Sequence, residues 1–133
     1  MVTNDPNGVV TLRGEGGVDQ LLRRAVARIE GLGLEVLAVI DHSGEAAEAG
    51  LSMPDAKLVL FGSPGAATRL MVAHPRIALD LPVKLLISEG NDGHVFVSYN
   101  APGYLAHRHG VTDDEADALR VVETIALATR STP

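Results

Sequence analysis

Four polar residues that could bind a ligand or move a proton each stand at one end of an apolar run: His42, Ser63, Asp80 and Asn100. Short apolar runs bounded by Gly, Pro and Asn are typical of buried strands. Strand ends that meet at one rim of a sheet bring such side chains together, and a small-molecule pocket needs only a few polar groups among apolar walls. We therefore expect these four residues to converge on one ligand site.

The stretch FGSPGAAT has the form of a helix start that follows a strand. Ser63 suits the N-cap position, and Pro64 suits the first helical position, where its missing N–H costs nothing. Free N–H groups at a helix start can hold an anion, so one interpretation is an anion or metabolite site formed by Gly62, Ser63, Gly65 and Thr68. A plain N-cap is the other, because the phosphate-binding patterns G-x-x-x-x-G-K-[ST] and G-x-G-x-x-G are both absent.

His42 is the candidate for acid or base chemistry. Its imidazole could exchange a proton with a substrate if a partner such as Asp80 or Tyr99 lay within hydrogen-bond reach. The alternative is that His42 only hydrogen-bonds the helix that follows its strand. Tyr99 and Asn100 offer an aromatic ring and an amide that could line a ligand cavity, or they mark a strand end and a turn.

The composition restricts the classes of partner and cofactor. The 133 residues carry a formal net charge of −6 and no cysteine. Nucleic acids and anionic membranes are bound mainly through clustered Lys and Arg, so we expect neither as a partner. The lack of cysteine excludes disulfides and thiolate metal sites. His107 and His109 would point about 200° apart on a helix and could not chelate one ion, so we expect no metal site and no cofactor.

Location and domain organisation follow from the distribution of apolar residues. No segment reaches the roughly 20 apolar residues of a membrane span. The first residues, MVTNDPNG, lack the apolar core of a signal peptide. We therefore expect a cytoplasmic protein in which residues 1–133 form one domain, with flexible ends at 1–8 and 131–133.

The apolar pattern predicts an α+β domain. Residues 18–32 repeat apolar positions at spacings of three and four, which is typical of one helical face. Apolar runs predict about five strands in a mainly antiparallel sheet, and the runs VKLLIS and HVFVSY flank a turn at 89–93 as a hairpin. Thr112 and Glu115 have the spacing of a capping box for the last helix. That helix carries a broad apolar face over 118–126, part of which we expect to meet a second subunit.

Several spaced motifs resemble one family. They are IDH at 40–42, FGSP at 61–64, LDLPVK at 79–84 and SYNAPGYLAHRHG at 98–110. Together they resemble the bacterial and archaeal family known as domain of unknown function 302, over about residues 15–110. The resemblance implies helices packed on an antiparallel sheet, similar to the TATA-binding-protein-like fold, and a homodimer. It implies no established reaction.

Three functions are compatible with these features. The first is a dimeric module that binds a small molecule, with an anion or metabolite at the helix start. The second is a hydrolase or isomerase in which His42 is the acid or base and Asp80 orients it. The third is a structural or partner-docking dimer that uses the apolar face 118–126. The residues expected to bind the small molecule are His42, Gly62, Ser63, Gly65, Thr68, Asp80, Tyr99 and Asn100.

Overall fold

The computed structural model describes residues 2–132 as an α+β domain built on one antiparallel sheet. The strand order is β1-β2-β6-β5-β4-β3, and every neighbouring pair is antiparallel. The five expected strands are all present, and a short sixth strand, β1, pairs with β2 inside the segment expected to be a flexible end. The strands are β1 Val2–Asn4, β2 Val9–Gly14, β3 Glu35–Asp41, β4 Ala56–Gly62, β5 Val83–Glu89 and β6 Val95–Asn100.

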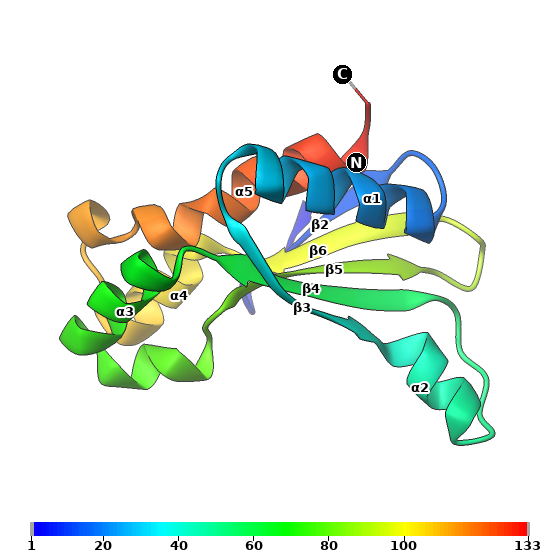
Figure 1. The fold of residues 1–133 in the computed structure, drawn as a ribbon, viewed down its shortest axis with the longest axis horizontal. Coiled ribbons are helices and arrows are strands. Elements are labelled where there is room, and N and C mark those ends of the chain that lie inside the picture. Colours follow the sequence, from blue (N-terminus) through cyan, green and yellow to red (C-terminus); the bar gives the residue numbers. More distant parts are fainter. Residues whose placement is uncertain (1, 133) are drawn as a thin grey trace.

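Two long helices cover one face of this sheet (Figure 1). The amphipathic helix α1, Val18–Gly31, buries Leu21 and Ile29, which are both 0% exposed. The last helix, α5, Asp117–Arg130, lies beside α1 and buries Leu119 and Ile125 in the same way. Alternation along the strands sends Val59, Phe61, Leu85, Ile87 and Val97 into this helix-covered core.

The apolar face of α5 is therefore used inside the chain, which corrects the expectation that part of it meets a second subunit. Leu119, Val122, Ile125 and Ala126 are at most 2% exposed in the single chain. The sequence pattern could not distinguish the two outcomes, because a wide apolar stripe suits a sheet contact and a subunit contact equally. Ala118 and Val121 are the apolar residues of the 118–126 face that remain half-buried.

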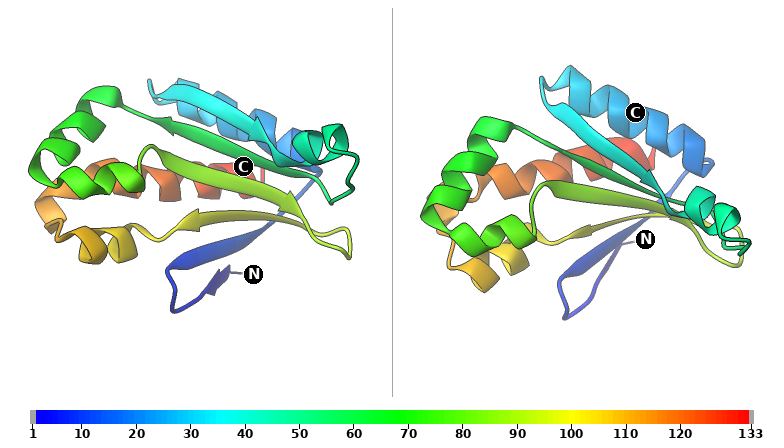
Figure 2. Two further views of the ribbon diagram at one scale, coloured as in Figure 1. Left: turned by 90° about the horizontal axis from the view of Figure 1, so that it is seen from below. Right: turned by 60° about the horizontal axis from the view of Figure 1, so that its bottom comes forward.

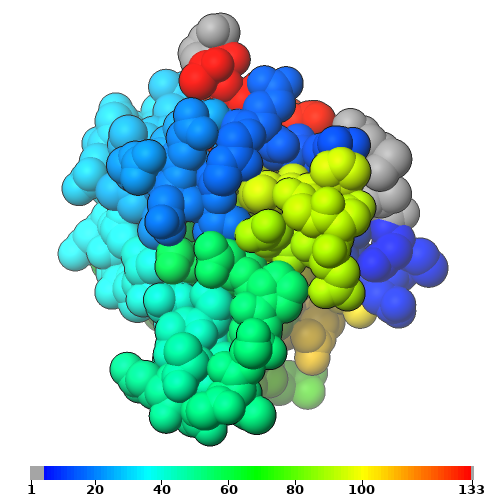
Figure 3. Space-filling view, turned by 90° about the vertical axis from the view of Figure 1, so that its right-hand side faces the viewer, coloured from blue at the N-terminus to red at the C-terminus, as the bar shows by residue number. Residues whose placement is uncertain are grey.

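The remaining helices lie at the two ends of the sheet. Helix α3, Pro64–Ala73, and helix α4, Pro102–His109, lie at the end on the left of Figure 1, with the short 3-10 helices η1, Pro75–Leu79, and η2, Asp113–Glu115. Helix α2, His42–Glu48, lies at the opposite end. It forms, with the residues that follow it, the bulge at the bottom of Figure 3.

None of the helices in residues 2–132 covers the second face of the sheet (Figure 2, left). Leu58, Leu60, Leu86 and Phe96 lie on this face, since they alternate with core residues, and each is half-buried. A search of the described helices finds none long and apolar enough to cross a membrane.

Candidate functional site

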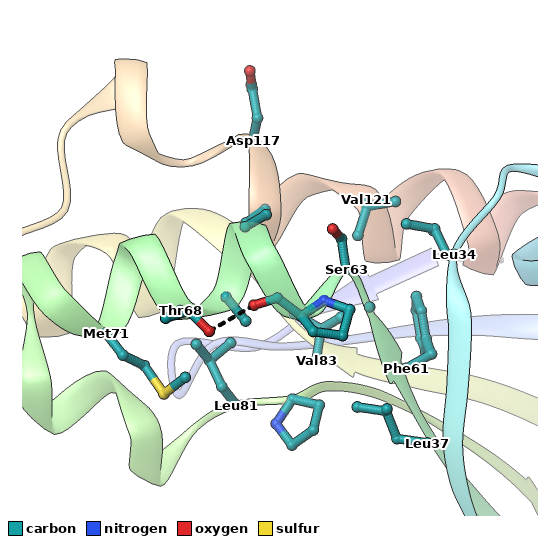
Figure 4. A pocket seen from close by; sticks show the side chains of 16 residues that line it. Leu34, Leu37, Phe61, Ser63, Thr68, Met71, Leu81, Val83, Asp117 and Val121 are labelled. Atoms are coloured by element: carbon teal, nitrogen blue, oxygen red, sulfur yellow. Dashed lines mark hydrogen bonds between the residues drawn. The ribbon is translucent and has the colours of Figure 1, made fainter.

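A cavity of about 500 Å³ lies where β4 ends and α3 begins. Phe61 is the last core residue of β4 and is fully buried. The chain then leaves the sheet at Gly62, whose φ of 155° lies in a region that side chains rarely adopt. Ser63 takes the N-cap position with extended backbone, and Pro64 opens α3 as expected. Because the chain turns at Gly62, α3 points away from the end of the sheet. The cavity lies beneath α3 (Figure 4).

Apolar side chains make most of the cavity wall. They come from the edge of β3, the end of β4, the inner side of α3, the connection into β5 and the first turns of α5. Small side chains on the two helices leave the space open, because Ala67 on α3 and Ala118 on α5 are too short to meet across it. The larger apolar lining residues are Leu34, Leu37, Phe61, Met71, Leu81, Val83 and Val121.

Three polar side chains border the cavity, and two of them have partners in the chain. Thr68 donates its hydroxyl to the Pro64 carbonyl at 2.8 Å, one turn back along α3. Asp117 accepts a hydrogen bond of 2.8 Å from Arg120 on α5. Ser63 makes no side-chain bond to the helix that it precedes, so its hydroxyl is free for another acceptor or donor.

His42 lies away from this cavity, which corrects the expectation that positions 42, 63, 80 and 100 share one rim. In the antiparallel pairing of β3 with β4, Glu35 lies opposite Gly62, and Asp41 lies opposite Lys57. His42 directly follows Asp41, so it stands at the other end of these strands from Gly62. Its side chain is exposed, and Asp80 is not brought to it.

The other predicted residues share one end of the sheet but not one cavity. Gly62, Ser63 and Thr68 line the cavity. Asp80 and Asn100 border a separate space of about 10 Å³, too small for a ligand. Gly65 faces away on α3 and is exposed. Tyr99 is half-buried on the helix-covered face of β6, and burial, with the negative charge of Glu123, raises its pKa.

Asp80 pairs with His109 rather than with His42. Asp80 Oδ2 and His109 Nε2 are 2.6 Å apart, and both side chains are largely buried. Arg108 Nη1 lies 3.3 Å from the same carboxylate oxygen, and Lys84 donates to the Asp80 carbonyl. Burial lowers the pKa of Lys84. No local sequence signal marks this pair, because the two residues are 29 positions apart and meet only through the packing of α4.

A second histidine–carboxylate pair lies close by in the chain. His74 Nε2 is 3.0 Å from Glu115 Oε1, and it joins the end of α3 to η2. Glu115 also accepts the Thr112 backbone N–H, as the expected capping box requires. That N–H and then His74 lower the pKa of Glu115 below its ordinary value of 4.5. The two pairs hold η1 at both ends, because His74 directly precedes this helix and Asp80 directly follows it. The chain then continues into the cavity wall at Leu81.

Metal ligands do not gather in the described part of the chain. Among residues 2–132, no group of three or more His, Cys, Asp or Glu side chains is placed to hold an ion. His107 is exposed on α4, while His109 is held by Asp80. The chemistry that this arrangement offers is therefore enclosure of an apolar molecule, with one free hydroxyl at the wall.

Comparison with known sequences gives one family and a set of longer relatives. A sequence model of the domain of unknown function DUF302 matches residues 10–129. Two curated relatives, both named fluoride-specific ion channel FluC 1, come from Brucella suis biovar 1 (strain 1330) and Brucella abortus biovar 1 (strain 9-941). Each is 36% identical over 120 residues, which is 89% of this chain but 47% and 44% of theirs. The chain thus spans less than half the length of these relatives.

One solved structure shares the fold. It is the crystal structure of an uncharacterized conserved DUF302 protein from Bacillus stearothermophilus, with a TM-score of 0.75 and 18% sequence identity. The alignment covers 92% of this chain and 95% of that one. The two proteins therefore share a fold despite their low sequence identity.

The Glu115 pair gives a prediction about stability and pH. A carboxyl group whose pKa is lower in the folded state stabilises the fold above its unfolded pKa, and this contribution is lost as pH falls through the folded value. The variant Glu115→Gln keeps an acceptor for Thr112 but removes the charge beside His74. We expect it to be less stable than the parent at pH 6, and the difference to be smaller at about pH 3, because the contribution of the carboxylate is lost as pH falls from the ordinary pKa of 4.5 through the lower folded value. Urea unfolding at both pH values measures this, and an equal difference at both would contradict it.

Proposed function

This chain belongs to the DUF302 family, described as a domain of unknown function, and we propose that it binds a small molecule in the cavity between α3 and α5. The observation that carries the proposal is the cavity itself. Its volume of about 500 Å³ is within the range of ligand pockets. The hollow exposes apolar surface of Met71 and Val121 to water, and a ligand that covers this surface gains the free energy of burying it.

The acid/base alternative has less support from the geometry. His42 is remote from Asp80, and the histidine that does pair with Asp80 is His109. Asp80, the carboxylate of that pair, borders a space of only about 10 Å³, which leaves no room for a substrate. Binding is therefore the function that we propose, and the pair serves to hold the cavity wall.

Filling the cavity tests the proposal. Ala67 lines it from α3, so Ala67→Trp should occupy the space that a ligand needs. We expect the parent to bind the uncharged fluorescent probe N-phenyl-1-naphthylamine with a saturable rise in emission, and Ala67→Trp to weaken binding at least about tenfold. The matched control is Ala73→Trp, at an exposed position of the same helix outside the cavity. Equal binding by both variants, or none by the folded parent, would contradict the proposal.

We further propose that the protein is a homodimer joined through the open face of its sheet. A two-fold interface places the same patch against itself, so like charges would oppose one another there. The patch formed by Leu58, Leu60, Leu86 and Phe96 is apolar and lies beneath none of the described helices, while Lys84, opposite Leu60, and Arg13, opposite Phe96, lie on the same face at its margin. The occupant that fits it is a second copy of this chain.

Sedimentation velocity tests the dimer. We expect the parent to sediment as a dimer at micromolar concentration, and Leu86→Glu to sediment as a folded monomer, because two buried carboxylates would face each other without partners. Val72→Glu is the control, since Val72 is 78% exposed on α3 and lies away from the sheet. A monomeric parent, or a Leu86→Glu variant that remains dimeric, would contradict this interface.

A second candidate function comes from the relatives that are named fluoride channels. This chain matches less than half of each, so we propose the role of an accessory domain that works with a fluoride channel rather than that of the channel itself. The proposal concerns the partner, and it is independent of which ligand the cavity binds.

A chimera tests the accessory role. In the Brucella suis relative, the matched segment is either deleted or replaced by this chain, and fluoride efflux from proteoliposomes is measured. We expect the replacement to restore the efflux rate of the parent channel and the deletion to change it. If deletion has no effect, or if the replacement behaves like the deletion, the accessory role is wrong.

A further inference from the structure

We infer that the molecule bound in the cavity is uncharged and mainly apolar, which rests on the binding function proposed above. This differs from the sequence-based interpretation of an anion at the helix start. The inference depends on which charged and polar groups reach the cavity and on which of them are already engaged.

Among the described residues, no basic side chain lines the cavity. Its one charged lining residue is Asp117, whose carboxylate is exposed and paired with Arg120, one turn further along α5. Arg69 is the nearest base on α3, and its guanidinium lies beside Gly65, on the outer side of the helix. A buried anion is most stable beside a paired cation, and this wall offers none; its donors are the Ser63 hydroxyl and the N–H groups at the α3 start.

The segment that leads into the cavity wall at Asp117 also favours an uncharged ligand. The segment from η2 into α5 is acidic, with Asp113, Asp114 and Glu115 preceding Asp117. His74 and Arg120 are the bases that face it, and each is engaged with a carboxylate. The α3 start lacks one N–H donor because Pro64 occupies its first position. The negative charge of this segment disfavours a carboxylate or phosphate ligand in the cavity.

One hydrogen-bonding group on the ligand is compatible with this wall. The Ser63 hydroxyl is free of the helix cap and lies at the cavity surface (Figure 4). Beside it, a Cβ added to Gly62 would meet no atom within 4 Å, so the backbone there borders open space. An ester, ketone or alcohol oxygen placed at Ser63, with its hydrocarbon body against Met71 and Val121, would satisfy both parts of the site.

A matched pair of ligands tests the inference. Methyl decanoate and decanoate have nearly the same shape and differ in charge at pH 8. We expect methyl decanoate to displace N-phenyl-1-naphthylamine at a concentration at least about tenfold lower than decanoate, because a charge without a partner is costly to bury. The variant Val121→Lys adds a cation to the lining, so it should narrow the difference between the two displacing concentrations by improving the affinity for decanoate. The control Leu127→Lys adds the same charge at an exposed position of α5 outside the lining, and it should leave that difference unchanged.

The outcomes separate this inference from the function on which it rests. If decanoate binds as well as its ester or better, the cavity binds ligands but its selectivity is for anions, and the inference is wrong. If Val121→Lys and Leu127→Lys change the difference between the two ligands equally, the lack of a cation in the cavity wall is not its cause, which also contradicts the inference. If the folded parent binds neither the probe nor either ligand, it is the proposed binding function that fails.

Discussion

The packing of α1 and α5 against one face of the sheet is the constraint on which the rest of the structure depends. Leu21 and Ile29 from α1, and Leu119 and Ile125 from α5, are all fully buried against the strands. Burial of apolar surface at this scale is the main favourable contribution to folding. Because the two helices fill the centre of one face, α3 is left to cross the sheet end, where short alanine side chains do not close the space.

The histidine–carboxylate pairs hold that end in place. His74–Glu115 and Asp80–His109 join η1 to the η2 and α4 segments across the chain, and η1 leads into the cavity wall. These contacts fix segments whose own apolar burial is small, since Ile77 is the single fully buried residue of η1. The chain therefore uses its polar contacts to position a wall and its apolar contacts to build the core.

Local sequence signals predicted local structure well. Apolar periodicity located α1 and all five of the expected strands, and the Ser63–Pro64 pair located the start of α3, because each signal acts within a few residues. The site was harder to predict because it depends on strand register. The antiparallel pairing of β3 and β4 separates His42 from Gly62, and no feature of either strand alone fixes that direction. The cavity walls look like ordinary core residues in the sequence, so only the packing of α3 distinguishes them.

Methyl resonances observed by NMR test the central claim, that the space beneath α3 is a ligand site. The chain is labelled at its alanine, leucine, valine and methionine methyl groups and titrated with N-phenyl-1-naphthylamine. The account predicts saturable shifts confined to methyls of the cavity wall, such as those of Ala67, Met71 and Val121. Shifts at Leu60 and Leu86 on the open sheet face with none at the cavity would contradict it.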